Sequence, residues 1–196
     1  MPITAVGGGN HNGVMSELAW ATLGTPVGRL SVACSQGGLS QIRFGAPRAA
    51  ARRSDVAPGD RARDLSGAAL TQLSEYFAGQ RQLFDVPIDW SVTSRLQQQV
   101  LRTLFDSVGY GETVSYGRLA RRAGVSGSGA SPPARAIGRI MGSNPIPVVV
   151  PCHRVVAADG LGGYSGGMGL EVKRWLLTLE GALPPTLDWD AASFRA

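Results

Sequence analysis

The sequence has few of the residues that cross-link a chain or bind metal ions. It contains two cysteines, Cys34 and Cys152, and two histidines among 196 residues. The cysteines are far apart and form no CxxC pair, which argues against a disulfide framework and against a cysteine-rich zinc site. We therefore expect a cytoplasmic protein that is kept reduced and uses neither a metal nor a cofactor.

Long apolar runs and a leader segment are also missing. The longest apolar run, over 146–151, is far too short to span a bilayer. Residues 1–17 lack a basic region followed by an apolar one, so they do not have the pattern of a signal peptide. We expect no membrane partner, a flexible tail at 1–17 and a C-terminal tail at 182–196.

What the sequence does contain is a globular composition with an uneven charge. Hydrophobic residues make up 43% and charged residues 17%, and the length fits one domain or two small ones. Residues 1–92 carry eight Arg and seven acidic residues, a net charge of +1, whereas residues 93–181 carry ten Arg or Lys and five acidic residues, a net charge of +5. A basic second half favours an anionic partner such as nucleic acid, although many cytoplasmic proteins are mildly basic.

The first half has a strand-like pattern followed by a helical one. Apolar and polar residues alternate on both sides of Gln36-Gly37-Gly38, which is the signal for a hairpin. Leu70, Leu73, Tyr76 and Phe77 then recur at helical spacing. Taken in order, these signals predict strands over 29–35 and 39–44, a loop over 46–63, a helix over 65–78 and a further strand candidate over 84–88.

The second half begins near Thr93 and is mostly helical. Ser94 and Ser115 are expected to cap helices, and Ser131-Pro132 is a cap followed by a proline at the first helical position. The predicted helices run from Ser94 to Ser107 and over 116–123, 132–141 and 170–179. The middle pair resembles a helix-turn-helix, and the alternative is an ordinary helical pair with solvated arginines.

The helix predicted over 132–141 has a low, basic surface. Arg135 and Arg139 lie four residues apart, next to the small residues Ala134, Ala136 and Gly138. Small residues let a backbone approach a nucleic-acid groove closely, and they would equally permit close packing of helices.

The segment 146–155 carries the strongest sign of chemistry. Its β-branched run predicts a buried strand or extended segment that ends at Pro151 and delivers Cys152 beside His153. A thiol becomes a nucleophile when an imidazole accepts its proton, either directly or through water. The alternative is a buried structural cysteine beside an unrelated histidine, which is the interpretation we give to Cys34 on the apolar face of its strand.

A glycine-rich loop over 160–167 follows this segment. It has neither the GK[ST] ending of a phosphate loop nor the Rossmann spacing, so we do not expect a nucleotide cradle. Tyr164 and Ser165 in this loop suit a flat heterocycle, which they could stack on and hydrogen-bond. The last helix ends at Glu180-Gly181, where a carboxylate could orient an imidazole.

Together these segments resemble the O6-alkylguanine-DNA alkyltransferases, also called methylated-DNA–protein-cysteine methyltransferases. The matching motifs occur in the family's order and cover nearly all of residues 93–181, whereas the first half matches only through its hairpin, helix and length. The motifs are Val114-Ser115-Tyr116-Gly117, Ala134-Arg135-Ala136-Ile137-Gly138, Asn144-Pro145, Pro151-Cys152-His153-Arg154-Val155, Gly163-Tyr164-Ser165-Gly166-Gly167 and Leu179-Glu180-Gly181.

The resemblance implies an α/β fold with two domains. Residues 18–92 would form an N-terminal ribonuclease H-like domain of sheet and helix. Residues 93–181 would form a mostly helical catalytic and DNA-binding domain that contains a helix-turn-helix.

The resemblance also implies catalytic roles. Cys152 would accept the alkyl group, His153 would take the thiol proton through water, and Glu180 would hold His153. Asn144 would brace the segment around Cys152. Tyr116 would assist flipping of the nucleotide and hydrogen-bond its base.

The remaining roles concern binding. Ser165 and the backbone of Cys152 and Val155 would complete the pocket for the base, and Pro147 and Tyr164 would line it. Arg135 would enter the base stack in place of the flipped guanine. Ala134 and Gly138 would lie against the minor groove, and Arg139 is the remaining DNA-binding residue of this helix.

The function implied is direct-reversal repair of double-stranded DNA. An alkyl group would pass from O6 of guanine, or from O4 of thymine, to Cys152 of a monomer, which stays alkylated. The sequence departs from the family pattern in a longer turn over 124–135, a shorter loop over 152–164 and the absence of the zinc ligands of some relatives, for which His11 and Cys34 are the only candidates.

Three other functions compete with this one. A binding-only alkyltransferase-like protein has tryptophan in place of the acceptor cysteine, so Cys152 argues against it. A Cys/His hydrolase gives no reason for Arg135 and the paired helices. A helix-turn-helix regulator has no need of Cys152 beside His153.

Overall fold

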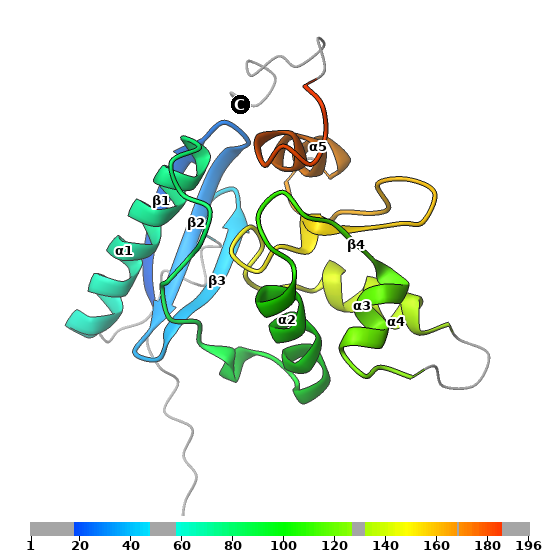
Figure 1. The fold of residues 1–196 in the computed structure, drawn as a ribbon. Helices are drawn as coiled ribbons and strands as arrows, with labels where there is room; N and C mark the ends of the chain where they lie inside the picture. The colour runs from blue at the N-terminus through cyan, green and yellow to red at the C-terminus, as the bar shows by residue number, and fades with distance from the viewer. Residues whose placement is uncertain (1–17, 48–57, 127–131, 168, 186–196) are drawn as a thin grey trace, which may run out of the picture.

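The N-terminal part is a three-stranded antiparallel sheet with one long helix across it. The computed structural model describes residues 18–47, 58–126, 132–167 and 169–185. Strands β1 (Ala19–Thr25), β2 (Gly28–Ser35) and β3 (Gly38–Phe44) lie in the order β1-β2-β3, and α1 (Asp60–Phe77) packs against them (Figure 1). The hairpin predicted from the alternating pattern is confirmed by the pairing of β2 with β3, in which Leu30 faces Phe44.

Two of the predicted boundaries in this part are wrong. Helix α1 begins at Asp60, inside the expected loop over 46–63, because Ala62 already packs in the core and extends the buried face by a turn. The strand expected over 84–88 does not form. Ile88 makes a single parallel bridge with Leu39, and Pro87, which has no N–H to donate, accepts from Leu39 instead.

The C-terminal part is mostly helical, as predicted. Its elements are η2 (Trp90–Val92), α2 (Arg95–Ser107), β4 (Val114–Ser115), α3 (Tyr116–Arg122), α4 (Pro133–Gly142), η3 (Cys152–Arg154), β5 (Val155–Val156) and α5 (Leu170–Leu179). The predicted caps form, since Ser94 Oγ accepts from Gln97 N at 3.3 Å and Ser115 Oγ accepts from Arg118 N at 3.3 Å. Helices α3 and α4 pack against each other as a helix-turn-helix would.

Helix α4 begins one residue later than predicted. Pro132 is its N-cap, with extended backbone, and Pro133 takes the first helical position. Ser131, the expected cap, lies outside the described residues, as do His11, the expected tail at 1–17 and residues 186–196 of the C-terminal tail. None of the helices within the described ranges has the length and apolar character needed to cross a membrane.

The apolar run over 146–150 is buried but does not form a strand. It folds into a turn in which Val150 N donates to Ile146 O at 2.9 Å, and Val148 has a φ of 75°. A β-branched residue adopts this left-handed conformation only under constraint from its surroundings. The constraint here is packing, because Ile146, Val148 and Val150 are all buried in the core.

One hydrophobic core runs through both parts of the chain. The buried cluster joins Leu30 and Leu73 of the sheet and α1 to Leu101 of α2 and Leu176 of α5. The edge strand β3 also meets the reactive segment directly, because Ile42 N donates to Pro145 O at 2.8 Å. The sheet is therefore fixed relative to the loop that leads to Cys152.

Candidate active site

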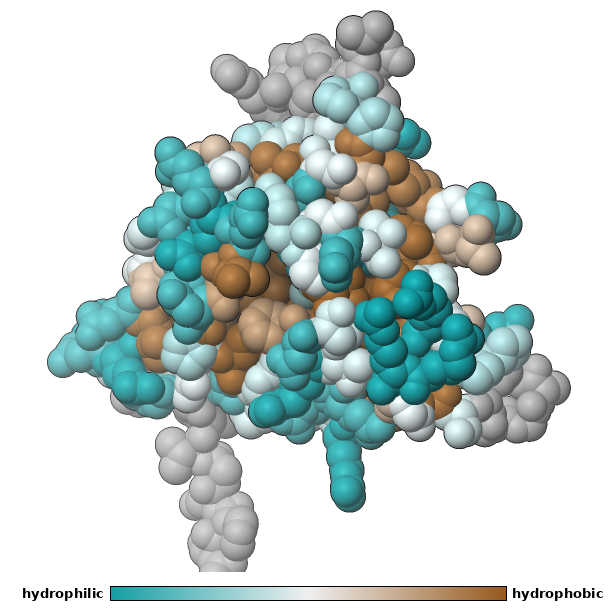
Figure 2. Space-filling model, in the orientation of Figure 1, coloured by the Kyte–Doolittle hydropathy of each residue, from teal (hydrophilic) through white to brown (hydrophobic). Residues whose placement is uncertain are grey.

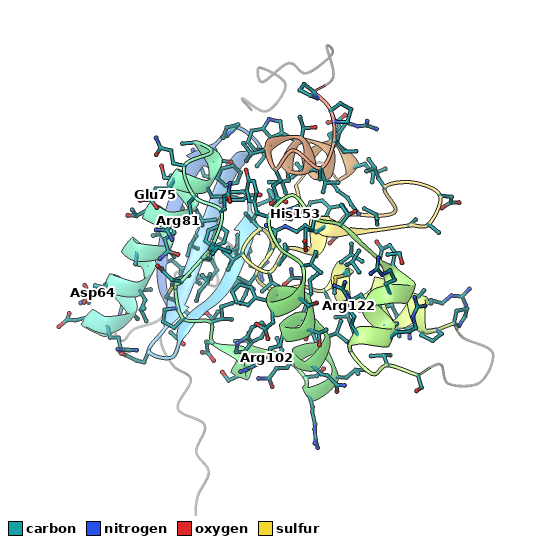
Figure 3. The ribbon with its side chains drawn as sticks, in the orientation of Figure 1. Asp64, Glu75, Arg81, Arg102, Arg122 and His153 are labelled. Atoms are coloured by element: carbon teal, nitrogen blue, oxygen red, sulfur yellow. The ribbon has the colours of Figure 1, made fainter. Side chains whose placement is uncertain are left out.

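Cys152 is the first residue of a short 3-10 turn that reverses the chain after Pro151. Cys152 N donates to Val150 O at 2.8 Å and Arg154 N donates to Pro151 O at 2.9 Å, so the chain is tightly coiled rather than extended here. The turn separates the two neighbouring side chains. Cys152 borders a cavity, whereas His153 is completely buried below α5, near the centre of the molecule (Figure 3).

The side chain of Cys152 lies between two cavities. The first has a volume of about 370 Å³ and is bordered by Tyr116 and Gly138, on the side of α3 and α4. The second has a volume of about 460 Å³ and is bordered by Pro147 and by strand β3 of the sheet. Tyr164 and Ser165 border both cavities, so the glycine-rich loop forms part of each wall.

His153 is held by a buried carboxylate. His153 Nε2 lies 2.9 Å from Glu180 Oε1, and both side chains are completely buried. Because the carboxylate oxygen can only accept, Nε2 carries the ring proton, and Nδ1, which has no hydrogen-bond partner among the described residues, offers a lone pair. Burial lowers the pKa of His153 against the opposing effect of Glu180, so the imidazole is neutral and able to accept a proton.

Two side chains besides His153 converge on Glu180. Arg154 donates from Nε to Oε2 at 2.9 Å and from its terminal nitrogen to Oε1 at 3.0 Å, and Tyr76 Oη donates to Oε1 at 2.6 Å. Burial would raise the pKa of Glu180, but its hydrogen bonds and charge interactions with His153 and Arg154 lower it to about 2. Glu180 is therefore ionised throughout the physiological range.

The thiol of Cys152 is protonated at rest. Burial raises its pKa to about 11, although a hydrogen bond with Asn144 and the charge of Lys173 act in the opposite direction. Asn144 also braces the loop, since its Nδ2 donates to Val150 O at 2.8 Å and its Oδ1 accepts from Ile146 N at 3.0 Å. A thiol in this state needs a base before it can attack.

Sequence reasoning missed Lys173 and Tyr76. Lys173 Nζ is fully buried and donates to Val155 O at 2.6 Å and to Gly163 O at 3.1 Å. Burial lowers its pKa to about 8, against the opposing effect of Cys152. A signal was present, because Lys173 is the only lysine in a chain whose other cations are all arginines. No sequence pattern connects Tyr76 with a carboxylate 104 residues away.

The residues expected to bind the base lie in different places. Tyr116 Oη donates to Gly163 O at 3.4 Å, and Ser165 Oγ donates to Gly142 O at 3.1 Å, both beside the first cavity. Pro147 borders the second cavity. Val155 borders neither of these two cavities; it is buried in β5 opposite Val114, and its N–H donates to Cys152 O.

The residues expected to bind DNA lie on α4, next to the first cavity. Arg135 and Arg139 are exposed, while Ile137 and Ile140 pack into the core, so the helix has a basic outer face. A Cβ added to Gly138 would meet nothing within 4 Å, which leaves the backbone open to approach. The most hydrophilic surface of the face drawn in Figure 2 lies over α3 and α4.

The described residues include no group of three or more His, Cys, Asp or Glu side chains that could hold a metal ion. Cys34 lies on β2, fully buried beneath α1, and burial raises the pKa of its thiol to about 12. No polar side chain contributes to that shift, so this cysteine has the surroundings of a structural residue.

Comparisons with known proteins give one consistent result. Residues 18–90 match the ribonuclease-like domain of 6-O-methylguanine DNA methyltransferase, and residues 95–182 match its DNA-binding domain. The chain is 40% identical to the methylated-DNA–protein-cysteine methyltransferase of Mycobacterium tuberculosis over 85% of this chain and 94% of the relative. It is 35% identical to the human protein of the same name over 84% of this chain and 81% of the relative.

Solved structures agree with these relatives. The crystal structure of Mycobacterium tuberculosis OGT in complex with DNA superposes with a TM-score of 0.67 at 38% identity, over 82% of this chain and 91% of that one. The O6-methylguanine-DNA methyltransferase of Pyrococcus kodakaraensis superposes with a TM-score of 0.56 at 26% identity, over 84% and 99% of the two chains. The α/β fold with a helical second part, as predicted, is thereby confirmed.

Proposed function

Because the chain belongs to the 6-O-methylguanine DNA methyltransferase family, we propose that Cys152 is the residue that receives the alkyl group. The protein repairs DNA by direct reversal: it transfers an alkyl group from damaged DNA to one of its own cysteines, and each chain acts once. The observation that carries the proposal is the position of the two cysteines. Cys152 borders two cavities, whereas Cys34 is sealed inside the N-terminal core.

The proton of the Cys152 thiol passes to His153. The free Nδ1 lone pair of His153 accepts it through a water molecule, and the ionised Glu180 stabilises the imidazolium that results. Arg154 and Tyr76 keep Glu180 in place by donating to it, which makes them positioning residues. The thiolate then attacks the alkyl carbon in line with the departing purine, so an S–C bond forms as the C–O bond breaks.

The first cavity, which we call the base pocket, receives the flipped base. It is bordered by Tyr116, Gly138 and Ser165, whose hydroxyls and backbone can hydrogen-bond a purine edge. The electron pair of the broken bond stays on the purine oxygen, and a proton returns to the ring to restore guanine. O6-alkylguanine is the substrate that this arrangement suits, with O4-alkylthymine as a smaller alternative.

Helix α4 approaches DNA through the minor groove. Arg135 is exposed on α4, three residues before Gly138, which borders the base pocket, and it occupies the space that the flipped base leaves in the stack. Ala134 and Gly138 allow close approach of the helix, and Arg139 contacts a phosphate. Asn144, Pro147, Tyr164 and Val155 support this site by holding the loops around Cys152.

The active unit is a monomer in the cytoplasm. Every residue of the proposed site comes from one chain, so no second copy is needed to complete it. Free Cys34 and Cys152 suit a reducing compartment, where the acceptor thiol stays available.

Intact-mass spectrometry tests the proposal. The protein is mixed with duplex DNA that contains O6-methylguanine, and we expect the mass to increase by one methyl group that peptide mapping places on Cys152. Cys152→Ala should gain nothing, and Cys34→Ala should gain the methyl group as the wild type does. Tight binding without any change in mass would contradict the proposal and favour a protein that only marks lesions.

A second experiment tests Arg135. If Arg135 holds the flipped state, Arg135→Ala should slow repair of duplex DNA far more than transfer from free O6-benzylguanine. Arg139→Ala removes the proposed phosphate contact on the same exposed face, so it measures how much of the loss a phosphate contact alone would cause. Equal losses on both substrates would contradict the proposed role of Arg135.

A further inference from the structure

The second cavity next to Cys152 is built by both parts of the chain. Ile42, Arg43 and Phe44 of β3 form one wall, and Pro147 and Gly166 border it from the C-terminal part. We call this cavity the alkyl chamber. Cys152 borders this chamber as well as the base pocket, so the two spaces meet at the thiol.

The wall from β3 is fixed in place by close packing. The ring of Phe44 meets that of Tyr164 edge to face, with centroids 6.5 Å apart and planes at 84°. A Cβ on Gly166 would lie 2.6 Å from both rings, so the glycine-rich loop can approach Phe44 only as glycine. On the other side, Ile42 N donates to Pro145 O at 2.8 Å. Arg43 lies between these two anchored neighbours.

Among the described residues that border the alkyl chamber, Arg43 is the only charged one. It is half-buried, and no described residue gives it an ion pair or a side-chain hydrogen bond. A guanidinium has five N–H donors in a planar fork that matches a carboxylate. A cation of this kind in the wall of the chamber has no acceptor side chain among the described residues, and a substrate can supply one.

We propose that Arg43 makes the protein favour O6 substituents that end in a carboxylate, which would meet the guanidinium in the alkyl chamber. This inference rests on the proposed function of Cys152. In the reaction with O6-carboxymethylguanine, the thiolate forms a bond to the methylene carbon while the bond from that carbon to O6 breaks. The electron pair goes to the purine, which takes up a proton, and the carboxylate remains unchanged on the new thioether beside Arg43.

The test compares three duplexes that differ only in the O6 substituent: carboxymethyl, carbamoylmethyl and methyl. The carbamoylmethyl group has the size of the carboxymethyl group without its charge. Single-turnover rate constants are measured for the wild type, for Arg43→Gln, for Arg43→Lys and for Arg29→Gln, which removes an exposed charge from the neighbouring strand β2.

We expect the wild type to favour carboxymethyl over carbamoylmethyl, and Arg43→Gln to lose about tenfold of that preference, as expected for a charged hydrogen bond. Arg43→Lys should keep part of the preference, since it keeps the charge. Arg29→Gln should keep all of it. The rate with O6-methylguanine should stay the same in every variant, because a methyl group does not reach Arg43.

Two results would overturn the inference. An unchanged preference in Arg43→Gln would show that Arg43 does not meet the substituent. An equal loss with all three duplexes would place Arg43 on the DNA backbone instead. Failure of the wild type to take up even the methyl group would be a different result, because it would remove the proposed function of Cys152 itself.

Discussion

The surroundings of Cys34 and Cys152 show what turns a buried thiol into a nucleophile. Both side chains are almost completely buried, at 0% and 5% exposure, and burial raises the pKa of both. Around Cys34 burial acts alone, and the pKa reaches about 12. Around Cys152, Asn144 and Lys173 oppose it, and a neutral imidazole held by a carboxylate lies at the next residue. Burial therefore raises the pKa of both thiols, and only the polar neighbours of Cys152 give its thiol the means to lose a proton.

The largest effect is expected when Glu180, the carboxylate that holds His153, is neutralised. Glu180→Gln keeps the shape of the side chain but removes the charge that stabilises the imidazolium. We expect the methyl-transfer rate constant to fall on the order of 100-fold, within the range of general acid–base catalysis. The matched control is Glu75→Gln, because Glu75 bonds Arg81 at the surface of α1, away from His153 (Figure 3). A rate within the error of the wild type would remove the proton relay from the mechanism.

The same variant changes the pH dependence of stability. The pKa of Glu180 in the folded state is about 2, below its ordinary value of 4.5. Its ionisation therefore contributes stability that is fully present above pH 4.5 and is lost as the pH falls through about 2. The contribution is about 3 kcal/mol. The free energy of unfolding of the wild type, measured in urea, should therefore fall steeply as the pH is lowered. Glu180→Gln should have a lower free energy of unfolding at neutral pH, and that value should depend less on pH. Parallel curves would contradict this account.

The next effect concerns the positive charge near Cys152. Lys173→Gln keeps a donor for Val155 O and Gly163 O but removes the charge, so the thiol pKa should rise and the transfer rate should fall about tenfold at neutral pH. The pKa of Lys173 is about 8, so the wild type loses the same charge above that pH. The ratio of the two rate constants should shrink there, whereas a purely structural role would leave it constant.

A smaller effect is expected from Tyr76, the residue of α1 that donates a hydrogen bond to Glu180. Tyr76→Phe removes one donor from Glu180 Oε1 and leaves those of His153 and Arg154. Because Glu180 is then held in place by fewer hydrogen bonds, we expect a rate loss of about threefold to tenfold. With fewer donors the carboxylate stabilises the imidazolium more, so the acidic limb of the pH–rate profile should move to higher pH. If the acidic limb of the pH–rate profile does not move, Tyr76 contributes only to packing and not to the proton relay.

The smallest effect on activity is expected at the other cysteine. Cys34→Ala removes a buried sulfur from the core, which costs about 1 kcal/mol of stability, comparable to the loss of a small buried group. Its methyl-transfer rate constant should equal that of the wild type, and both this rate constant and the free energy of unfolding are measured for each protein. A slower transfer would contradict the contrast between the two cysteines, because it would connect Cys34, a buried core residue, to the reaction.

The local elements of this protein follow directly from its amino-acid sequence. Serines ahead of amphipathic stretches cap α2 and α3, the alternating pattern gives β2 and β3, and Cys152-His153 marks the reactive segment. These features depend on neighbours within a few residues along the chain, so the sequence contains them directly. The family could be predicted for the same reason, since its motifs are short and ordered.

How these elements meet depends on contacts between segments that are far apart in the sequence. The β-branched run before Pro151 folds into a turn because core packing holds Val148 at a positive φ. Tyr76 reaches Glu180 across 104 residues, and β3 supplies a wall of the alkyl chamber because its edge bonds to Pro145. Such contacts arise from the packing of the sheet against the helical part. The spacing of residues along the chain does not reveal which distant segments come into contact in the core.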